Sequence, residues 1–208
     1  SSNPAELLDM PKLHEKAIIR MSPQEVSKLI DIIESGDGLS ERQKRFHART
    51  ARRDIAIAVL FLTTGIRISE LVGLNIEDLN FQDLSFRVTR KGGSQSILYF
   101  DYETENALSE YLEQRKIEGS YSLSSPLFLS LQGKRITVRA VENLIQKYAK
   151  IAAPLKHITP HKLRSTYGTM LYQQTGDIYL VADVLGHKDV NTTRKHYAAM
   201  AEENRKKA

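Results

Sequence analysis

The residues with the clearest potential for chemistry lie in the stretch 159–164, which reads T-P-H-K-L-R. A threonine followed by a proline is typical of a helix start. His161 and Arg164 are three positions apart, so they share one face of the first helical turn, where free backbone N–H groups and the helix dipole favour an anion. The pair therefore suits a phosphate group, although taken alone it is also the pattern of a capping or core histidine beside a surface arginine.

A second arginine, Arg67, lies in the stretch 63–71 (T-T-G-I-R-I-S-E-L), just past a glycine-marked turn. Its apolar neighbours predict that the guanidinium is partly buried, and a buried guanidinium needs an anionic partner. Glu70 could be that partner in an intradomain ion pair. It could also orient Arg67 while the guanidinium fork binds phosphate oxygens, and the two interpretations are compatible.

A lysine, Lys91, is expected at the tip of a tight hairpin turn in the stretch 90–93 (R-K-G-G). One interpretation is a charged turn residue that keeps an exposed loop soluble. The other is a mobile cation, flanked by glycines, that enters a substrate-bound site and donates a proton. A lysine suits that work because its pKa responds readily to its surroundings.

The last candidates lie in the stretch 185–197 (L-G-H-K-D-V-N-T-T-R-K-H-Y). His187 follows a glycine that is expected to end one helix, and Tyr197 lies on the short helix expected next. Of the nine tyrosines, Tyr111, Tyr148 and Tyr167 fall at helical positions where a ring with a polar tip packs into a core. The same explanation fits Tyr197 when that residue is taken alone.

Local signals predict the elements that must position these residues. Capping residues, apolar periodicity and terminating glycines predict helices, and two β-rich runs around the glycine turn predict a hairpin. The predicted fold class is α+β, mostly α-helical with one small antiparallel β-sheet. The expected helices span residues 22–35, 41–64, 68–74, 101–118, 137–152, 159–174 and 177–186, with a last one capped by Asn191; the expected strands span 84–89 and 96–100, with a short third strand at 126–130.

Composition narrows the class of protein. The chain has 208 residues, of which 41% are hydrophobic, which is enough for a sizeable core. It has no cysteine, which excludes disulfides, thiolate metal sites and a cysteine nucleophile. No apolar run approaches the length of a membrane span and no signal-peptide layout is present, so the chain is expected to be cytoplasmic and without a membrane partner. A net charge of +5 gives a moderate bias toward polyanionic partners.

Taken together, the motifs closely resemble the catalytic domain of the tyrosine recombinase, or phage integrase, family in their letters, order and spacing. They are T-G-I-R-I-S-E-L, R-K-G-G on a hairpin, T-P-H-K-L-R, L-G-H-K-D-V-N-T-T and the tyrosine that follows. The resemblance covers about residues 21–199, so residues 21–208 are expected to form a catalytic domain with a C-terminal tail. Residues 1–20 resemble that family's linker from a missing N-terminal core-binding domain.

The resemblance implies a site-specific DNA recombinase, an integrase that cleaves and rejoins DNA strands for the integration or excision of a mobile element or prophage. Tyr197 would attack a phosphodiester in line, giving a 3′-phosphotyrosyl link and a free 5′-hydroxyl. A second strand's 5′-hydroxyl would then reverse the step, with no metal, cofactor or ATP. The residues that match the family's catalytic set are Arg67, Lys91, His161, Arg164, His187 and Tyr197, with Glu70 supporting Arg67.

The residue types fit that chemistry. The charge of a phosphodiester repels nucleophiles and spreads further in the transition state, so fixed cations such as Arg67 and Arg164 would contribute most of the catalysis. A phenol with a pKa of about 10 is mostly protonated at neutral pH. His161 is therefore the best candidate to accept its proton, with His187 donating to a phosphate oxygen. Lys91 would protonate the departing 5′-oxygen.

Two positions depart from the family's pattern. Tyr197 is ten residues after His187, one more than in many members, so His196 stands where the nucleophile would otherwise fall. Tyr197 is still the predicted nucleophile, because an imidazole cannot replace the phenol without changing the chemistry. Ser165 stands where many relatives have a second histidine, which leaves the hydrogen-bond network of the site open.

The expected partner is double-stranded DNA, bound mainly through its phosphates. The chain is expected to be a monomer in solution and a homotetramer on DNA, with accessory DNA-bending proteins as further partners. The alternatives are a type IB topoisomerase-like relaxing activity, a catalytically inactive DNA-binding relative, and metal-dependent hydrolysis, which the lack of an H-E-x-x-H spacing disfavours. The cations expected to contact DNA, unless they form only a solvated charged face, are Arg90, Lys134, Arg135 and Arg139.

Overall fold

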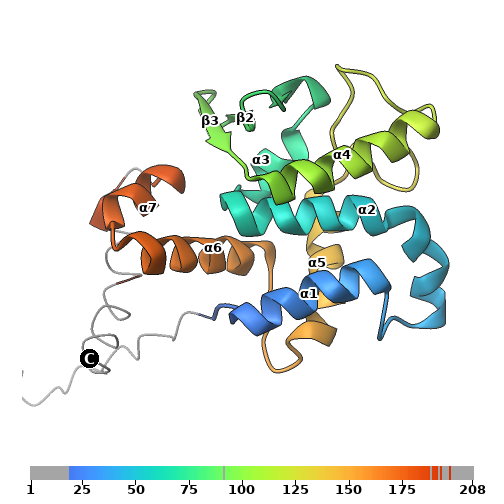
Figure 1. The fold of residues 1–208 in the computed structure, drawn as a ribbon, viewed down its shortest axis with the longest axis horizontal. Coiled ribbons are helices and arrows are strands. Elements are labelled where there is room, and N and C mark those ends of the chain that lie inside the picture. Colours follow the sequence, from blue (N-terminus) through green and yellow to red (C-terminus); the bar gives the residue numbers. More distant parts are fainter. Residues whose placement is uncertain (1–18, 91, 188, 192, 194–196, 198–208) are drawn as a thin grey trace, which may run out of the picture.

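The computed structural model describes residues 19–90, 92–187, 189–191, 193 and 197, and Figure 1 shows their arrangement. The chain is mainly helical with one small antiparallel sheet, which confirms the predicted fold class. The elements in chain order are α1 (Pro23–Ser35), α2 (Glu41–Thr64), α3 (Ile68–Gly73), the 3₁₀ turn η2 (Ile76–Asp78), β1 (Leu79–Asn80), β2 (Ser85–Thr89), β3 (Gln95–Tyr99), α4 (Tyr102–Ile117), α5 (Val138–Ala152), α6 (Pro160–Thr175) and α7 (Ile178–Val184).

Helices begin at side-chain caps and end at glycines, close to the positions that the sequence predicts. Ser22 accepts a hydrogen bond from the backbone N–H of Glu25, and the Glu25 carboxylate accepts one in return, so α1 begins with a capping box. Helix α2 ends at Gly65, whose φ of 62° lies in the left-handed region that favours glycine. Two residues later Arg67 caps α3, so the turn at Gly65 carries the chain directly from the core to a candidate site residue.

Helix α2 lies at the centre of the core. Its C-terminal half is almost wholly buried, including Ile57, Leu60 and Phe61, and it packs against α1, α4 and α6. Figure 1 shows α4 and α1 on opposite sides of α2. Because burial of this apolar surface fixes the C-terminal end of α2, it also fixes the turn that leads to Arg67.

The sheet has the strand order β1-β2-β3, and neighbouring strands are antiparallel. Each residue of β2 faces one of β3, which confirms the predicted hairpin. The turn between them is closed by two backbone hydrogen bonds, from Arg90 N–H to Ser94 O at 2.7 Å and from Gly93 N–H to Arg90 O at 3.0 Å. Arg90 is therefore the residue at which β2 passes into the turn.

The predicted third strand at 126–130 is wrong. Among the described residues this segment forms only isolated bridges, at Pro126 and Leu129. The reason is tertiary: the buried guanidinium of Arg115 takes the carbonyls of Pro126 and Leu127, which a strand ladder would need, and a proline has no N–H to donate. The third strand of the sheet is instead the short β1.

The predicted cap of the last helix is also wrong. Val190 and Asn191 are already helical, as are Thr193 and Tyr197. The side chain of Asp189, not Asn191, takes the capping role and accepts a hydrogen bond from the Asn191 backbone N–H at 2.9 Å. A carboxylate is the stronger acceptor at a helix N-terminus, because it carries the charge that the dipole favours.

Several predictions fall on residues outside the described part of the chain. They concern Lys91, His196, the predicted C-terminal tail after Tyr197, and the predicted linker apart from its last two residues. Within the described part, no helix combines the length and the apolar character that crossing a membrane requires.

Candidate active site

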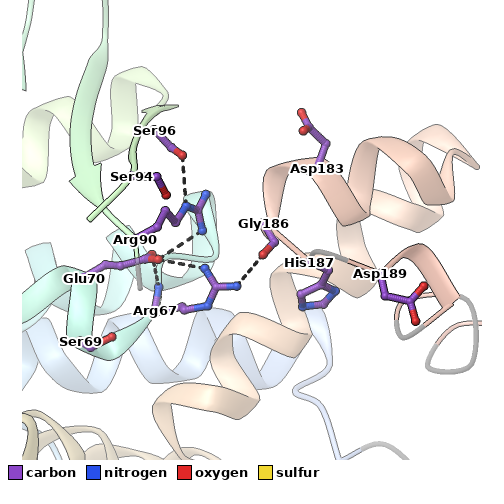
Figure 2. A pocket seen from close by; sticks show the side chains of 10 residues that line it. All are labelled: Arg67, Ser69, Glu70, Arg90, Ser94, Ser96, Asp183, Gly186, His187 and Asp189. Carbon is purple, nitrogen blue, oxygen red and sulfur yellow. Dashed lines mark hydrogen bonds and ion pairs between the residues drawn. The ribbon is translucent and has the colours of Figure 1, made fainter. Parts of the chain in front are cut away.

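An open cavity of about 740 Å³ lies where three segments distant in the sequence meet. They are α3, the β2–β3 hairpin, and the end of α7 with the loop that follows it (Figure 2). Charged, hydroxyl and imidazole side chains line the cavity together: Arg67, Ser69, Glu70, Arg90, Ser94, Ser96, Asp183, His187 and Asp189, with the backbone of Gly186.

The carboxylate of Glu70 is the most buried charge of this cavity, with a side chain only 3% exposed. It accepts hydrogen bonds from Nη1 of Arg67 at 2.9 Å and from the Arg67 backbone N–H at 3.0 Å. The Arg67 side chain is 34% exposed, and its Nη2 donates to the carbonyl of Gly186 at 2.8 Å. The predicted ion pair is thus present, and it leaves the guanidinium accessible from the cavity.

Arg164 lies on the first turns of α6, is only 6% exposed and does not line the cavity. Its guanidinium donates to the carbonyls of Gly65 and Leu185. Gly65 lies two residues before Arg67, and Leu185 lies two residues before His187. Burial lowers the pKa of Arg164 to about 10, and the positive charge of Arg67 acts in the same direction. The side chain is still a cation at neutral pH, held in a fixed direction by main-chain oxygens.

His187 lies at the opposite wall of the cavity. Its backbone N–H donates to Ala182 O at 2.9 Å, which ties the residue to α7. The Nδ1 atom of its ring lies 2.7 Å from the hydroxyl oxygen of Thr193. This contact fixes the orientation of the imidazole, which is a condition for directed proton transfer or hydrogen bonding.

Tyr197 is buried, with 2% of its surface exposed. Its ring packs with Val181 and Leu185, and the ring centroid of Tyr172 lies 5.6 Å away. Burial raises the pKa of the Tyr197 phenol above its ordinary value, while the nearby Arg164 and a hydrogen bond with Thr169 act in the opposite direction. The phenol is therefore within the electrostatic range of Arg164 but is not part of the cavity lining.

The structure brings some of the predicted residues together and holds others apart. Arg67, Glu70 and His187 share the cavity, and Arg164, which does not line it, lies within electrostatic range of Arg67 and Glu70. His161 is exposed on the first turn of α6 and does not line the cavity. The serine beside Arg164 has a local role, since the Ser165 hydroxyl donates to the His161 carbonyl at 3.0 Å.

The predicted DNA-contacting cations divide into two groups. Arg90 lines the cavity and bonds Glu70 at 3.2 Å, so it belongs to the site rather than to a remote surface. The other three are exposed and lie outside the cavity lining. Arg135 donates to the carbonyls of Val72 and Leu74, and Arg139 approaches Glu142 at 3.4 Å.

Sequence reasoning missed the parts of the site that are not local in the chain. The carbonyl of Gly186 and the hydroxyls of Ser96 and Thr193 gave no signal, because backbone and hydroxyl partners have no distinctive spacing. Arg90 is different, because it directly follows a predicted strand and adjoins the predicted hairpin turn. Its place next to Lys91 in the sequence could therefore have suggested that it belongs to the site.

Chemically, the cavity can bind an anion that fits between fixed guanidiniums and a histidine, such as a phosphate group. Comparison with known proteins agrees with this chemistry. The chain matches the phage integrase family over residues 20–204 and belongs to that family.

Two relatives of this chain are named tyrosine recombinases. The tyrosine recombinase XerC of Thermodesulfovibrio yellowstonii is 38% identical over 149 residues, which cover 70% of this chain and 50% of the relative. The tyrosine recombinase XerC of Pelobacter propionicus is 32% identical over 198 residues, which cover 94% of this chain and 60% of the relative. The chain thus spans between 50% and 60% of the length of these relatives.

Solved structures agree on the fold. The crystal structure of XerA recombinase matches with a TM-score of 0.71 and 28% identity, covering 90% of this chain and 65% of that one. The XerH site-specific recombinase bound to its palindromic difH substrate, a post-cleavage complex, matches with a TM-score of 0.72 over 88% of this chain and 50% of that one. At 22% identity the second likeness concerns the fold alone.

Proposed function

We propose that this chain is the catalytic part of a site-specific DNA recombinase, which cleaves and rejoins DNA strands through a covalent 3′-phosphotyrosine at Tyr197. The observation that carries the proposal is the convergence of Arg67, Arg90 and Arg164 on the surroundings of one carboxylate, Glu70. Asp183 and Asp189 also line the cavity, but among the described residues the ion pairs of Arg67 and Arg90 are with Glu70. One contacting carboxylate cannot neutralise three guanidiniums, so the site favours an additional anion such as a phosphodiester. The XerC relatives, named tyrosine recombinases, support the same activity.

In the proposed reaction the phenolic oxygen of Tyr197 attacks the scissile phosphorus, and the bond to the 5′-oxygen breaks. The phenolic proton passes to His161, and Lys91 gives a proton to the departing 5′-oxygen. Arg67 and Arg164 bind the nonbridging oxygens, whose charge grows in the transition state, and His187 donates to one of them. A 5′-hydroxyl from a second strand reverses these steps, so the phosphodiester energy is conserved and no cofactor is consumed.

The proposed attack requires Tyr197 to leave its buried position, because the phenol faces α6 rather than the cavity. Burial also keeps the phenol protonated, since it raises the pKa. We infer that DNA binding moves Tyr197 relative to α6 and extends the site toward His161, which lies exposed on the same helix as Arg164. The resting protein then holds its nucleophile neutral and away from the phosphate site.

Double-stranded DNA is the proposed substrate, and integration or excision of a mobile element or prophage is the proposed outcome. The proposed assembly is a monomer in solution and a homotetramer on DNA, because strand exchange requires two paired sites. Accessory DNA-bending proteins are further proposed partners. Lys134, Arg135 and Arg139, which are exposed, are proposed contacts to DNA phosphates outside the cavity.

The experiment that tests the proposal is covalent capture on nicked DNA. A pool of duplexes with randomised sequence carries a nick beside the cleavage position, so that the short 5′-hydroxyl fragment diffuses away and the protein–DNA adduct accumulates. Sequencing the DNA recovered in detergent-resistant adducts identifies the site, and mass spectrometry of the linked peptide identifies the nucleophile. The expected result is an adduct on Tyr197 that forms equally well in excess EDTA.

The variant Tyr197→Phe removes only the hydroxyl and should abolish the adduct while DNA binding is retained. His196→Ala is the matched control and should still form the adduct. An undiminished adduct in Tyr197→Phe would refute the assignment. Relaxation of supercoiled DNA without exchange between two captured sites would instead indicate a type IB topoisomerase-like activity.

A further inference from the structure

Arg90 is the third cation of the cavity and the one whose surroundings are least expected from the sequence. It directly follows β2, and its side chain is 12% exposed. As Figure 2 shows, its Nη1 donates to Oε1 of Glu70 at 3.2 Å and its Nε donates to the hydroxyl of Ser96 at 3.3 Å. Arg67 donates to the same Oε1 at 2.9 Å. Two guanidiniums therefore share one carboxylate oxygen.

The lack of a side chain at Gly186 leaves space for the Arg90 guanidinium. A Cβ added at Gly186 would lie 2.5 Å from Nη1 of Arg90 and 2.7 Å from Cζ, so any larger residue would displace the arginine. The carbonyl of the same glycine accepts the hydrogen bond from Arg67. The loop after α7 thus contacts both arginines, which indicates that Arg90 is part of the cavity wall and not a loosely held surface side chain.

The charge around Arg90 is unbalanced. Figure 2 shows Asp183 and Asp189 on the α7 side of the cavity with no ion pair drawn to Arg67 or Arg90, and of the three acids that line the cavity Glu70 is the one that contacts both arginines. Burial is the largest cause of the lowered pKa of Arg164, and the charges of Arg67 and Arg90 act in the same direction while Glu70 opposes them, so both arginines repel Arg164 across the site. A bound phosphodiester would relieve this repulsion.

Arg90 also keeps donors for such a ligand. Within the described residues its hydrogen bonds use Nε and one N–H of Nη1, and Nη2 donates to no protein oxygen. A guanidinium has five N–H donors in a fixed plane, so one edge can be held by a carboxylate while the other binds an oxygen of a phosphate.

Resting on the proposed function, we infer that Arg90 binds the scissile phosphate beside Arg67 and Arg164, as a third arginine of the catalytic pocket. Its ligand is the nonbridging oxygen of the phosphodiester that is cut, and not a phosphate elsewhere along the DNA. The shared carboxylate of Glu70 holds Arg67 and Arg90 at a fixed separation, so that both are oriented before the charge of the transition state develops.

The test uses the DNA site recovered by covalent capture, prepared in two forms. One carries the natural phosphate at the cleavage position, and the other carries a methylphosphonate, which is neutral because a methyl group replaces the charged oxygen. The variant Arg90→Gln should slow adduct formation on the phosphate by about 100-fold, as expected for the loss of one preorganised donor. On the methylphosphonate its deficit should shrink to less than about tenfold, because there is little charge left to neutralise.

Arg87→Gln is the matched control. Arg87 lies on β2, the strand that Arg90 follows, and also pairs with a carboxylate, that of Asp78 at 3.1 Å, but it is outside the cavity. It should behave as the parent protein on both substrates. Arg90→Lys keeps the charge without the planar fork, and should lie between the parent and Arg90→Gln on the phosphate. It also tests the inference if thermal unfolding shows that Arg90→Gln does not fold.

The outcomes distinguish a failure of this inference from a failure of the proposed function. If the parent protein forms no Tyr197 adduct on any DNA, the proposed function fails and the inference fails with it. If the parent forms the adduct but Arg90→Gln or Arg90→Lys does so at the parent's rate, only the inference is overturned. An equal deficit on phosphate and methylphosphonate would also overturn it, because a purely structural role is indifferent to the charge of the substrate.

Discussion

Replacing Gly168 with alanine should release Tyr197 from its buried position on α6. A Cβ at residue 168 would lie 2.2 Å from the Tyr197 hydroxyl oxygen and 3.0 Å from Cδ1 of Leu185. The phenol cannot simply retreat, because its ring packs against Tyr172 and Val181. The alanine methyl group and the phenol therefore cannot both keep these positions.

The size of the effect follows from two opposing terms. Overpacking of a core position costs about 1–3 kcal/mol. Alanine also favours a helix interior over glycine by roughly 0.5–1 kcal/mol, but this gain is present whether Tyr197 is docked or released. The clash alone therefore shifts the docking equilibrium, by about 5- to 150-fold toward the released phenol.

The assay is a spectrophotometric titration of the phenol. Burial raises the pKa of Tyr197, so the docked phenol should ionise above the ordinary value of about 10. In Gly168→Ala its pKa should fall toward that value, because the released ring is solvated. Subtracting the titration of a matching protein that also carries Tyr197→Phe isolates this phenol from the other eight of the nine tyrosines.

Gly73→Ala is the control for this experiment. Gly73 is also a helical glycine, but a Cβ there would meet no atom within 4 Å. It should leave the Tyr197 titration unchanged. The reasoning is refuted if folded Gly168→Ala gives the parent titration curve, or if both glycine variants shift the pKa equally.

Two further predictions concern stability. The free energy of unfolding should decrease as the pH rises above about 10, because burial raises the pKa of Tyr111, Tyr148, Tyr167 and Tyr197 and keeps these phenols neutral in the fold, whereas those of the unfolded chain ionise. Urea unfolding at a series of alkaline pH values measures this, and stability that stays flat through that range would contradict it. Arg115→Ala should destabilise the fold by about 3–5 kcal/mol, because it leaves the buried carbonyls of Pro126 and Leu127 without their donor. Calorimetry should show a melting temperature lower by roughly 6–20 °C, while Lys116→Ala, at the exposed neighbouring position, should change it little.

Much of the fold could be predicted because its signals are local. Caps such as Ser22 and terminating glycines such as Gly65 mark helix ends within a few residues of sequence, and the glycine turn marks the hairpin. The failures at 126–130 and at Asn191 have another origin. In the first, Arg115 supplies hydrogen bonds from a different helix, which no local propensity predicts. In the second, Asp189 caps the helix two residues before the predicted Asn191, and both are capping residue types within one short stretch.

In the site, too, contacts between residues close in sequence could be predicted, and contacts between distant residues could not. Arg67 and Glu70 could be paired from their spacing alone, since residues three apart on a helix are neighbours. The partnership of Arg90 with Glu70 spans 20 residues, and that of Arg67 with Gly186 spans 119. The burial of Tyr197 depends on the shape of α6 at Gly168. Contacts of this kind exist only after the chain has folded, so no spacing rule predicts them.

Arg164 connects the ends of two helices, since its guanidinium donates to the carbonyl of Gly65, where α2 ends, and to that of Leu185, where α7 ends. The last carbonyls of a helix lack intrahelical partners and carry partial negative charge, so a buried cation between them stabilises both helices. This contribution to stability does not depend on any reaction of the cavity. Retention of an arginine here in a distant homologue would consequently be a sign of common architecture, and only the phenol and the accessible arginines would indicate whether that homologue shares the proposed chemistry.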